Sequence, residues 1–181
     1  LETNGELCGN NHALVKNVYD HFEQFNITTF NGAAVTASLD QCEQTYETNN
    51  VKDRIRRENI SPGLDERNYN VMKEEFVNGY IATQVLAQFK APATRVRVTK
   101  LNPGKIINPH IDYDPTYAVR ILIPLVTDPL VINEFWRKDV HEVVHLPADG
   151  HAYFLNTGVK HAVSNNSSIS RIALMISLDG T

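Results

Sequence analysis

The chain has 181 residues, of which 42% are hydrophobic and 21% are charged, and its formal net charge is −4. This length and composition suit one globular domain with a substantial core, so we expect residues 1–181 to form a single domain. The negative net charge argues against a nucleic-acid-binding protein. No apolar run approaches the roughly 20 residues of a membrane span, and no signal-peptide pattern opens the sequence. We therefore expect a cytoplasmic protein that binds neither nucleic acid nor membrane.

The first half of the sequence has helical periodicity. Apolar residues recur at helical spacing between residues 12 and 25, and a longer apolar stripe over residues 70–90 predicts a second helix. We therefore expect residues 1–92 to be mainly helical and to support the rest of the domain. This half also contains both cysteines, Cys8 and Cys42. They are interpreted as free thiols of a reducing compartment, with a single disulfide between them as the alternative.

From residue 93 onward the periodicity becomes that of β-strands. The run TRVRVTKL alternates along its length, and NPGK at residues 102–105 is a turn signal. Seven further β-like runs follow at short spacing, with no helical pattern between them: KIINPHI, YAVRILIPLV, LVINEF, HEVVHL, HAYFL, HAVSN and SRIALMISL. Eight short strands separated by turns predict a sandwich, jelly roll or barrel. The predicted fold class is therefore α+β, with N-terminal helices packed on a β-barrel formed by residues 93–181.

Three side chains in the β-rich half form a candidate metal site. His110 and Asp112 are two residues apart on a predicted strand, so their side chains point to the same face with Cβ atoms roughly 7 Å apart. His161, on a later strand, is able to supply a third ligand. Two histidines and one carboxylate form the facial triad of non-haem Fe(II) oxygenases, which leaves coordination positions open for a cosubstrate and O₂. The alternative is an ordinary polar patch on a strand.

Arg171 opens the apolar run RIALMISL. An arginine at the start of a core strand is costly to bury unless its charge is paired. A dicarboxylate cosubstrate would pair it through the two parallel hydrogen bonds that a guanidinium offers. The alternative is an arginine at a strand end whose side chain reaches solvent.

These motifs resemble the Fe(II)/2-oxoglutarate-dependent oxygenases, and in particular the aspartyl/asparaginyl β-hydroxylase branch, which includes proline cis-4-hydroxylase-like enzymes. The resemblance covers residues 93–180 and is carried by LNPGKIINPHID, VRILIPLVTDP, LPADGHAYFLNTGVKHAVSN and RIALMISL. It implies a double-stranded β-helix, or cupin-like jelly roll, in which Fe(II) is held by His110, Asp112 and His161. It also implies that Arg171 anchors the cosubstrate 2-oxoglutarate.

Two more site residues are implied by the same resemblance. Thr99 occupies the position of a hydroxyl that helps to bind the 2-oxoglutarate carboxylate. Arg120 occupies the position of an arginine that faces the pocket and contacts substrate or cosubstrate. The sequence departs from some relatives, because animal β-hydroxylases lack the carboxylate ligand that Asp112 provides, and Leu122 replaces a histidine that contacts the cosubstrate.

The resemblance implies a dioxygenase that uses O₂ and converts 2-oxoglutarate to succinate and CO₂. Its substrate would be a small-molecule amino acid, or an Asp, Asn or Pro-type side chain in a peptide. Two functions of other classes remain as alternatives. One is a non-catalytic cupin-like binding module, which would keep the fold without turnover.

The other alternative is a zinc metalloprotease, because HEVVH at residues 141–145 matches the HExxH motif. That chemistry needs both histidines on one face of a helix, with Glu142 as the general base. The β-branched centre of the motif predicts a strand instead. On a strand, His141 and His145 would lie about 13 Å apart, which is too far to share an ion.

Overall fold

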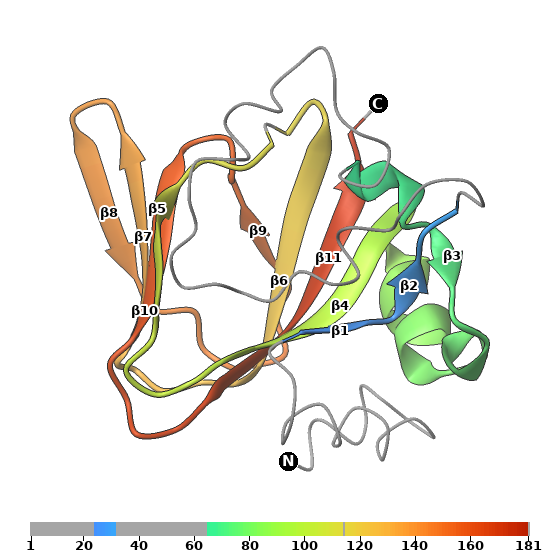
Figure 1. Cartoon of the computed structure of the whole chain (residues 1–181), viewed down its shortest axis with the longest axis horizontal. Coiled ribbons are helices and arrows are strands. Elements are labelled where there is room, and N and C mark those ends of the chain that lie inside the picture. The colour runs from blue at the N-terminus through green and yellow to red at the C-terminus, as the bar shows by residue number, and fades with distance from the viewer. Residues whose placement is uncertain (1–23, 32–64, 114, 181) are drawn as a thin grey trace.

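The computed structural model describes residues 24–31, 65–113 and 115–180. The predictions for residues 12–23, for Cys8 and for Cys42 lie outside these ranges. The described strands form three antiparallel sheets (Figure 1). The five-stranded sheet has the order β1 (Gln24–Asn26), β4 (Ala93–Leu101), β11 (Arg171–Asp179), β6 (Ala118–Val126) and β9 (Tyr153–Leu155). The four-stranded sheet has the order β5 (Ile106–His110), β10 (Lys160–Asn165), β7 (Val131–Arg137) and β8 (Val140–Val144). A third sheet pairs β2 (Thr28–Thr29) with β3 (Val71–Met72).

The two larger sheets form a double-stranded β-helix. From β4 to β11 the chain passes back and forth between them, so strands that are distant in sequence become neighbours. The two sheets stand opposite each other, with β6, β11 and β4 in one wall and β5, β10 and β7 in the other (Figure 1). Each of the eight predicted β-like runs overlaps one of these strands, so the predicted jelly-roll core is confirmed.

The helical support differs from the prediction. Within the predicted helix of residues 70–90, the structure has the 3-10 turn η4 (Glu74–Phe76) and then a continuous helical segment made of the π-helix η5 (Ile81–Val85) and the 3-10 turn η6 (Leu86–Gln88). A further 3-10 turn, η3 (Glu66–Asn68), precedes them. The end of the first predicted helix is also wrong, because Gln24–Asn26 is a strand that pairs with β4. Among the described residues, no helix has the length and apolar character needed to cross a membrane.

The hydrophobic core lies on the outer face of the five-stranded sheet. Alternate residues of β4, β6 and β11 point outward and pack against Ile27, Phe76, Ile81 and Val85. The outward residues are Val96, Val98, Ile121, Ile123, Leu125, Ile172, Leu174, Ile176 and Leu178. Because side chains alternate along a strand, the residues between them face the interior of the β-helix. That inner face carries the polar residues from which the candidate site is built.

Candidate metal centre

The two histidines and the aspartate predicted from the sequence lie together at one end of the β-helix. His110 ends β5, Asp112 follows it by two residues, and His161 on β10 is the antiparallel register partner of His110. One potential ligand atom from each side chain lies within 4.8 Å of the others. The Nε2 atom of His110 is 3.7 Å from Oδ1 of Asp112. Two neighbouring strands of one sheet, with the residues just after β5, therefore bring together a set of donors that is able to hold a divalent ion.

Backbone carbonyl groups orient both imidazole rings. His110 Nδ1 lies 2.7 Å from the carbonyl oxygen of Asn108, and His161 Nδ1 lies 2.9 Å from that of Val159. A carbonyl oxygen can only accept a hydrogen bond, so Nδ1 carries the proton in each ring. In a neutral ring this leaves the lone pair on Nε2, the atom that faces the other members of the triad. Histidine ligands of metals are commonly fixed in this way.

Burial keeps one of the two rings neutral. Desolvation lowers the pKa of His161 to about 4, against the opposing attraction of Asp112. A metal ligand must be unprotonated, so this shift favours binding of a cation at neutral pH.

Arg171 begins β11 on the inner face and is 5% exposed. Its Nη1 atom lies 3.5 Å from Oγ1 of Thr99, and its Nε atom is buried without a hydrogen-bond partner. Burial lowers the pKa of its guanidinium to about 10. Within the described ranges, no carboxylate is in ion-pair contact with this residue. Thr99 and Arg171 thus lie side by side, and the Arg171 guanidinium has a donor left for an anion. Their contact with 2-oxoglutarate stays a prediction.

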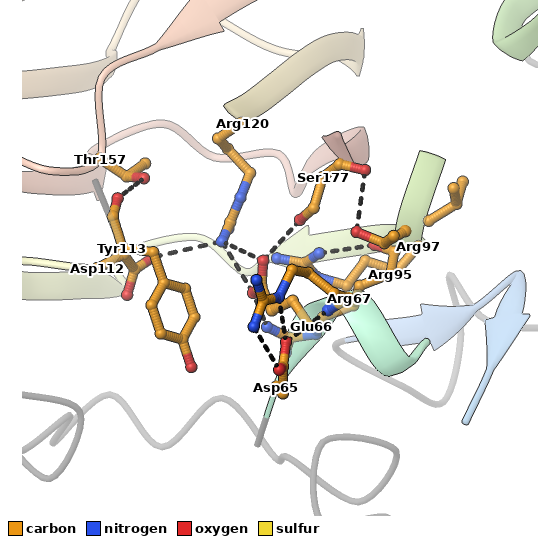
Figure 2. Close-up of polar contacts among 12 residues, drawn as sticks. Asp65, Glu66, Arg67, Arg95, Arg97, Asp112, Tyr113, Arg120, Thr157 and Ser177 are labelled. Atoms are coloured by element: carbon orange, nitrogen blue, oxygen red, sulfur yellow. Dashed lines mark hydrogen bonds and ion pairs between the residues drawn. The ribbon is translucent and has the colours of Figure 1, made fainter. Parts of the chain in front are cut away.

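A second charged group lies beside the triad and is centred on Glu66 of η3 (Figure 2). The Glu66 carboxylate is 1% exposed and accepts hydrogen bonds from Arg95, from Arg120 at 2.9 and 3.1 Å, and from Ser177 at 2.7 Å. Arg120 also lies 3.7 Å from Oδ2 of Asp112, so it stands between the two carboxylates. Burial raises the pKa of Glu66, but the nearby arginines outweigh it and hold the pKa well below its usual range.

A β-bulge in β4 positions Arg95 for this contact. The register between β4 and β11 slips between Met175 and Ser177, and Arg95 has a φ of 41°, a region that non-glycine residues rarely adopt. The backbone N–H of Arg95 donates to the carbonyl of Tyr69, at 2.7 Å, instead of extending the ladder. The bulge thereby attaches η3 and Tyr69, the residue after it, to the beginning of β4.

Glu66, Arg95 and Arg97 were not predicted from the sequence as site residues. Arg95 and Arg97 sit inside the core strand run TRVRVTKL, so they could have been identified in the same way as Arg171. Glu66 had no such signal, because it lies in a polar stretch far from its partners. Arg120 was expected to face the pocket, and it does lie on the inner face, but its guanidinium is engaged by Glu66. Its contact with substrate or cosubstrate stays a prediction.

The metalloprotease alternative lacks the geometry that it needs. HEVVH does not form a helix, because Val140–Val144 is strand β8 at the exposed edge of the four-stranded sheet. His141 Nε2 contacts Oε2 of Glu134 at 2.8 Å, whereas His145 Nδ1 contacts the carbonyl of Val131 at 3.1 Å. The two histidines therefore have separate partners and do not meet at a common point.

Comparison with known families identifies the family to which the chain belongs. The family model described as aspartyl/asparaginyl β-hydroxylase matches residues 69–180. This chain belongs to the aspartyl/asparaginyl β-hydroxylase family. The match includes all three residues of the triad, Thr99, Arg120 and Arg171, but not Glu66. No curated protein matches the chain.

Solved structures similar to this β-hydroxylase family member cover about half of it. An oxidoreductase of the 2OG-Fe(II) oxygenase family from Burkholderia pseudomallei is 16% identical, with a TM-score of 0.45 over 58% of this chain and 55% of its own. A cupin domain from Bordetella pertussis is 21% identical, with a TM-score of 0.38 over 51% of this chain and 88% of its own. The fold assignment rests on the strand order itself.

Proposed function

We propose that this chain is an Fe(II)/2-oxoglutarate-dependent dioxygenase that hydroxylates an amino acid or an Asp, Asn or Pro-type side chain. The observation that carries the proposal is the convergence of His110, Asp112 and His161, whose ligand atoms lie within 4.8 Å of one another. Two imidazoles and one carboxylate are the donor set of non-haem Fe(II) oxygenases. Membership of the β-hydroxylase family agrees with this chemistry.

The environment of Arg171 supports 2-oxoglutarate as the cosubstrate. A guanidinium that is buried without a counter-charge is costly. A carboxylate bound there would satisfy its unpaired Nε–H and gain two parallel, charge-assisted hydrogen bonds. Thr99 would add its hydroxyl group to the same oxygen atoms. The residues present therefore fit a ligand with a terminal carboxylate.

Each residue has a definite task in this proposal. His110, Asp112 and His161 would hold Fe(II), and the carbonyls of Asn108 and Val159 keep the two rings aligned. When bound, Fe(II) and 2-oxoglutarate supply the oxidising chemistry by which O₂ hydroxylates an unactivated carbon, with succinate and CO₂ as the other products. Arg171 and Thr99 would orient the cosubstrate, and the buried inner face would keep bulk water from the reacting groups.

Replacement of the only carboxylate in the triad tests the proposal. Asp112→Ala removes the anionic ligand, so the affinity for Mn(II), used anaerobically in place of iron, should fall by about 100-fold or more. Loss of a mere outer-shell partner already costs about 10- to 100-fold. Succinate formation from 2-oxoglutarate should be abolished. Both quantities are measured, by calorimetry and by a coupled succinate assay.

Glu142→Gln is the matched control, because it alters the exposed strand β8 and has no role in the proposed reaction. This variant should retain the parent's succinate formation. A loss of about 10² or more, the scale of a general base, would revive the metalloprotease alternative. Normal turnover in Asp112→Ala would contradict the triad, and metal binding without any 2-oxoglutarate turnover in the parent would favour the cupin-like binding module.

A further inference from the structure

Arg97 is a buried cation that has no role in the metal triad or in the proposed 2-oxoglutarate site. It lies on the inner face of β4, two residues from Thr99, and is 3% exposed. It donates one hydrogen bond, at 2.9 Å, to the carbonyl oxygen of Arg95. Within the described part of the chain, no carboxylate is in ion-pair contact with Arg97. A guanidinium is not buried in this way without a cost in stability.

The charges around Arg97 do not balance. In residues 24–31, 65–113 and 115–180, the carboxylates that act on Arg97 are those of Glu66 and Asp112, whereas Arg95 and Arg120 act on it as like charges. Glu66 is already shared by Arg95 and Arg120. The two flanking carboxylate and guanidinium groups of η3, Asp65 and Arg67, pair with each other and do not alter the balance.

Unused hydrogen-bond donors accompany the excess positive charge. The Nε atoms of both Arg95 and Arg120 are buried and have no hydrogen-bond partner. Burial lowers the pKa of Arg97, and the neighbouring charges of Arg95 and Arg120 lower it further. The group therefore lacks one anion that is able to accept hydrogen bonds.

The anion missing near Arg97 is distinct from the 2-oxoglutarate carboxylate proposed to bind Arg171. Arg171 is the register partner of Leu101, four residues along β4 from Arg97, which corresponds to about 13 Å along the strand. The two guanidinium groups also have different partners, because Arg171 reaches Thr99 whereas Arg97 turns away from Thr99 toward the Arg95 carbonyl. The small side chains of Thr99 and Ala173, which are register partners, lie between them.

We infer that Arg97 binds a carboxylate of the substrate, with the free Nε donors of Arg95 and Arg120 beside it. The inference rests on the proposed function, since it places substrate next to Asp112 through Arg120 and leaves Arg171 to the cosubstrate. The carboxylate has two possible sources, the α-carboxylate of a free amino acid and the side chain of an Asp residue in a peptide. In either case the substrate presents a carboxylate to Arg97.

Thermal shift measurements on the full chain test this assignment even though the substrate is unidentified. The parent, Arg97→Met, Arg97→Lys and Arg137→Gln are loaded anaerobically with Mn(II), each with and without 2-oxoglutarate. The probes are the twenty free L-amino acids, their primary amides, and a peptide that contains one Asp and has both termini blocked. Arg137 is an exposed arginine at the end of β7, so its variant is the matched control.

At least one free acid, or the blocked Asp peptide, should raise the thermal midpoint of the parent and of Arg137→Gln more than its amide or Asn counterpart does. The same probe should bind Arg97→Met at least about 30-fold more weakly, the effect of removing a charged partner, and Arg97→Lys should fall between. A response to free acids identifies the α-carboxylate, and a response to the peptide alone identifies the Asp side chain. Without any probe, Arg97→Met should melt a few degrees higher than the parent, because an unpaired buried charge is gone.

Three results would overturn the assignment of Arg97. One is the absence of any acid that stabilises the parent more than its amide does. Another is a midpoint of Arg97→Met well below that of the parent, which would reveal a structural ion pair. The third is loss of 2-oxoglutarate binding in Arg97→Met, which would assign the residue to the cosubstrate. If the parent itself fails to bind 2-oxoglutarate, the proposed function is wrong, and the arms without 2-oxoglutarate still decide the role of Arg97.

Discussion

At the scale of single residues, the inner face of the β-helix is distinguished by buried arginines with different partners. Arg95 and Arg120 share the carboxylate of Glu66. Arg97 and Arg171 have no carboxylate in contact within the described ranges, and both have their pKa lowered chiefly by burial. Because a buried charge must be compensated, we propose these two arginines as the anion-binding residues of the site. The inner face of the five-stranded sheet thus carries two arginines that are paired with Glu66 and two that we assign to ligands.

The role of Arg171 can be tested by two substitutions that separate charge from shape. Arg171→Met removes the charge, so the affinity for 2-oxoglutarate should fall by more than about tenfold, since loss of a charged partner costs roughly 2–5 kcal/mol. Arg171→Lys keeps the charge but loses the planar fork, so it should raise the apparent KM for 2-oxoglutarate by a smaller factor. Calorimetric titration of 2-oxoglutarate into the anaerobic Mn(II) protein measures the binding.

Mn(II) affinity is the internal control for both Arg171 variants, because Arg171 is not one of the triad residues. It should equal that of the parent. If Arg171→Met binds 2-oxoglutarate as tightly as the parent does, Arg171 is not the anchor. Arg120, which faces the same interior, becomes the next candidate.

At the scale of elements, the short turn η3 is joined to the barrel by charge rather than by apolar packing. Glu66 enters the inner end of the five-stranded sheet and is bonded to residues of β4, β6 and β11. The bulge at Arg95 and the hydroxyl group of Tyr117, which donates to Asp65, hold the same turn from two more sides. A single buried carboxylate therefore connects three strands of the wall that carries the candidate site.

Glu66→Gln should be strongly destabilising. The substitution keeps the shape but leaves the guanidinium groups of Arg95 and Arg120 without the carboxylate that they share. Breaking a buried ion pair by removal of one partner costs about 3–5 kcal/mol. Glu74→Gln, at an exposed position of η4, is the matched control and should change the free energy of unfolding by less than about 0.5 kcal/mol. Urea unfolding followed by circular dichroism measures both, and equal stability of the two variants would contradict the central role of Glu66.

The strands were predictable from sequence, but the helical residues only in part. Alternation and turn residues are local signals, so the runs from Ala93 onward could be identified without tertiary information. The apolar stripe over residues 70–90 correctly indicated Phe76, Ile81 and Val85 as core residues. It did not show that this stretch begins with strand β3 and a 3-10 turn, or that its helical residues 81–88 are of π and 3-10 type. The pairing of Gln24–Asn26 with β4 is a non-local contact that no local pattern reveals.

At the scale of the whole molecule, one part of the candidate site, the metal triad, could be predicted from the sequence. The other part, the charged group around Glu66, could not. His110, Asp112 and His161 could be proposed because strand geometry limits which side chains can meet. The contacts of Glu66 span 29, 54 and 111 residues of sequence. They depend on how η3 is placed against the finished β-helix, and a polar loop residue carries no sign of that placement. A charge network of this kind becomes visible only when the fold is known.

The buried state of His161 also makes the stability of the whole metal-free molecule depend on pH. Its pKa is lowered from 6.5 to about 4 by burial. Between these values the unfolded chain binds a proton that the folded chain does not, so the free energy of unfolding decreases as the pH falls. At 1.36 kcal/mol per unit, the full loss is about 3 kcal/mol. Glu66 and Asp65, whose pKa values lie below their usual range, add their own losses only below about pH 4.5.

Urea unfolding in the presence of a chelator, at intervals between pH 7.5 and about pH 4.5, measures this dependence. We expect a constant free energy of unfolding from pH 7.5 to about pH 6.5 and a decline below that, because the window is set by the two pKa values of His161. The control is His161→Gln, which cannot take up a proton at this position and should have a flatter profile over the same range. A parent protein that is equally stable at pH 7.5 and at pH 5 would contradict the burial of a neutral His161, and with it the pre-formed state of the triad.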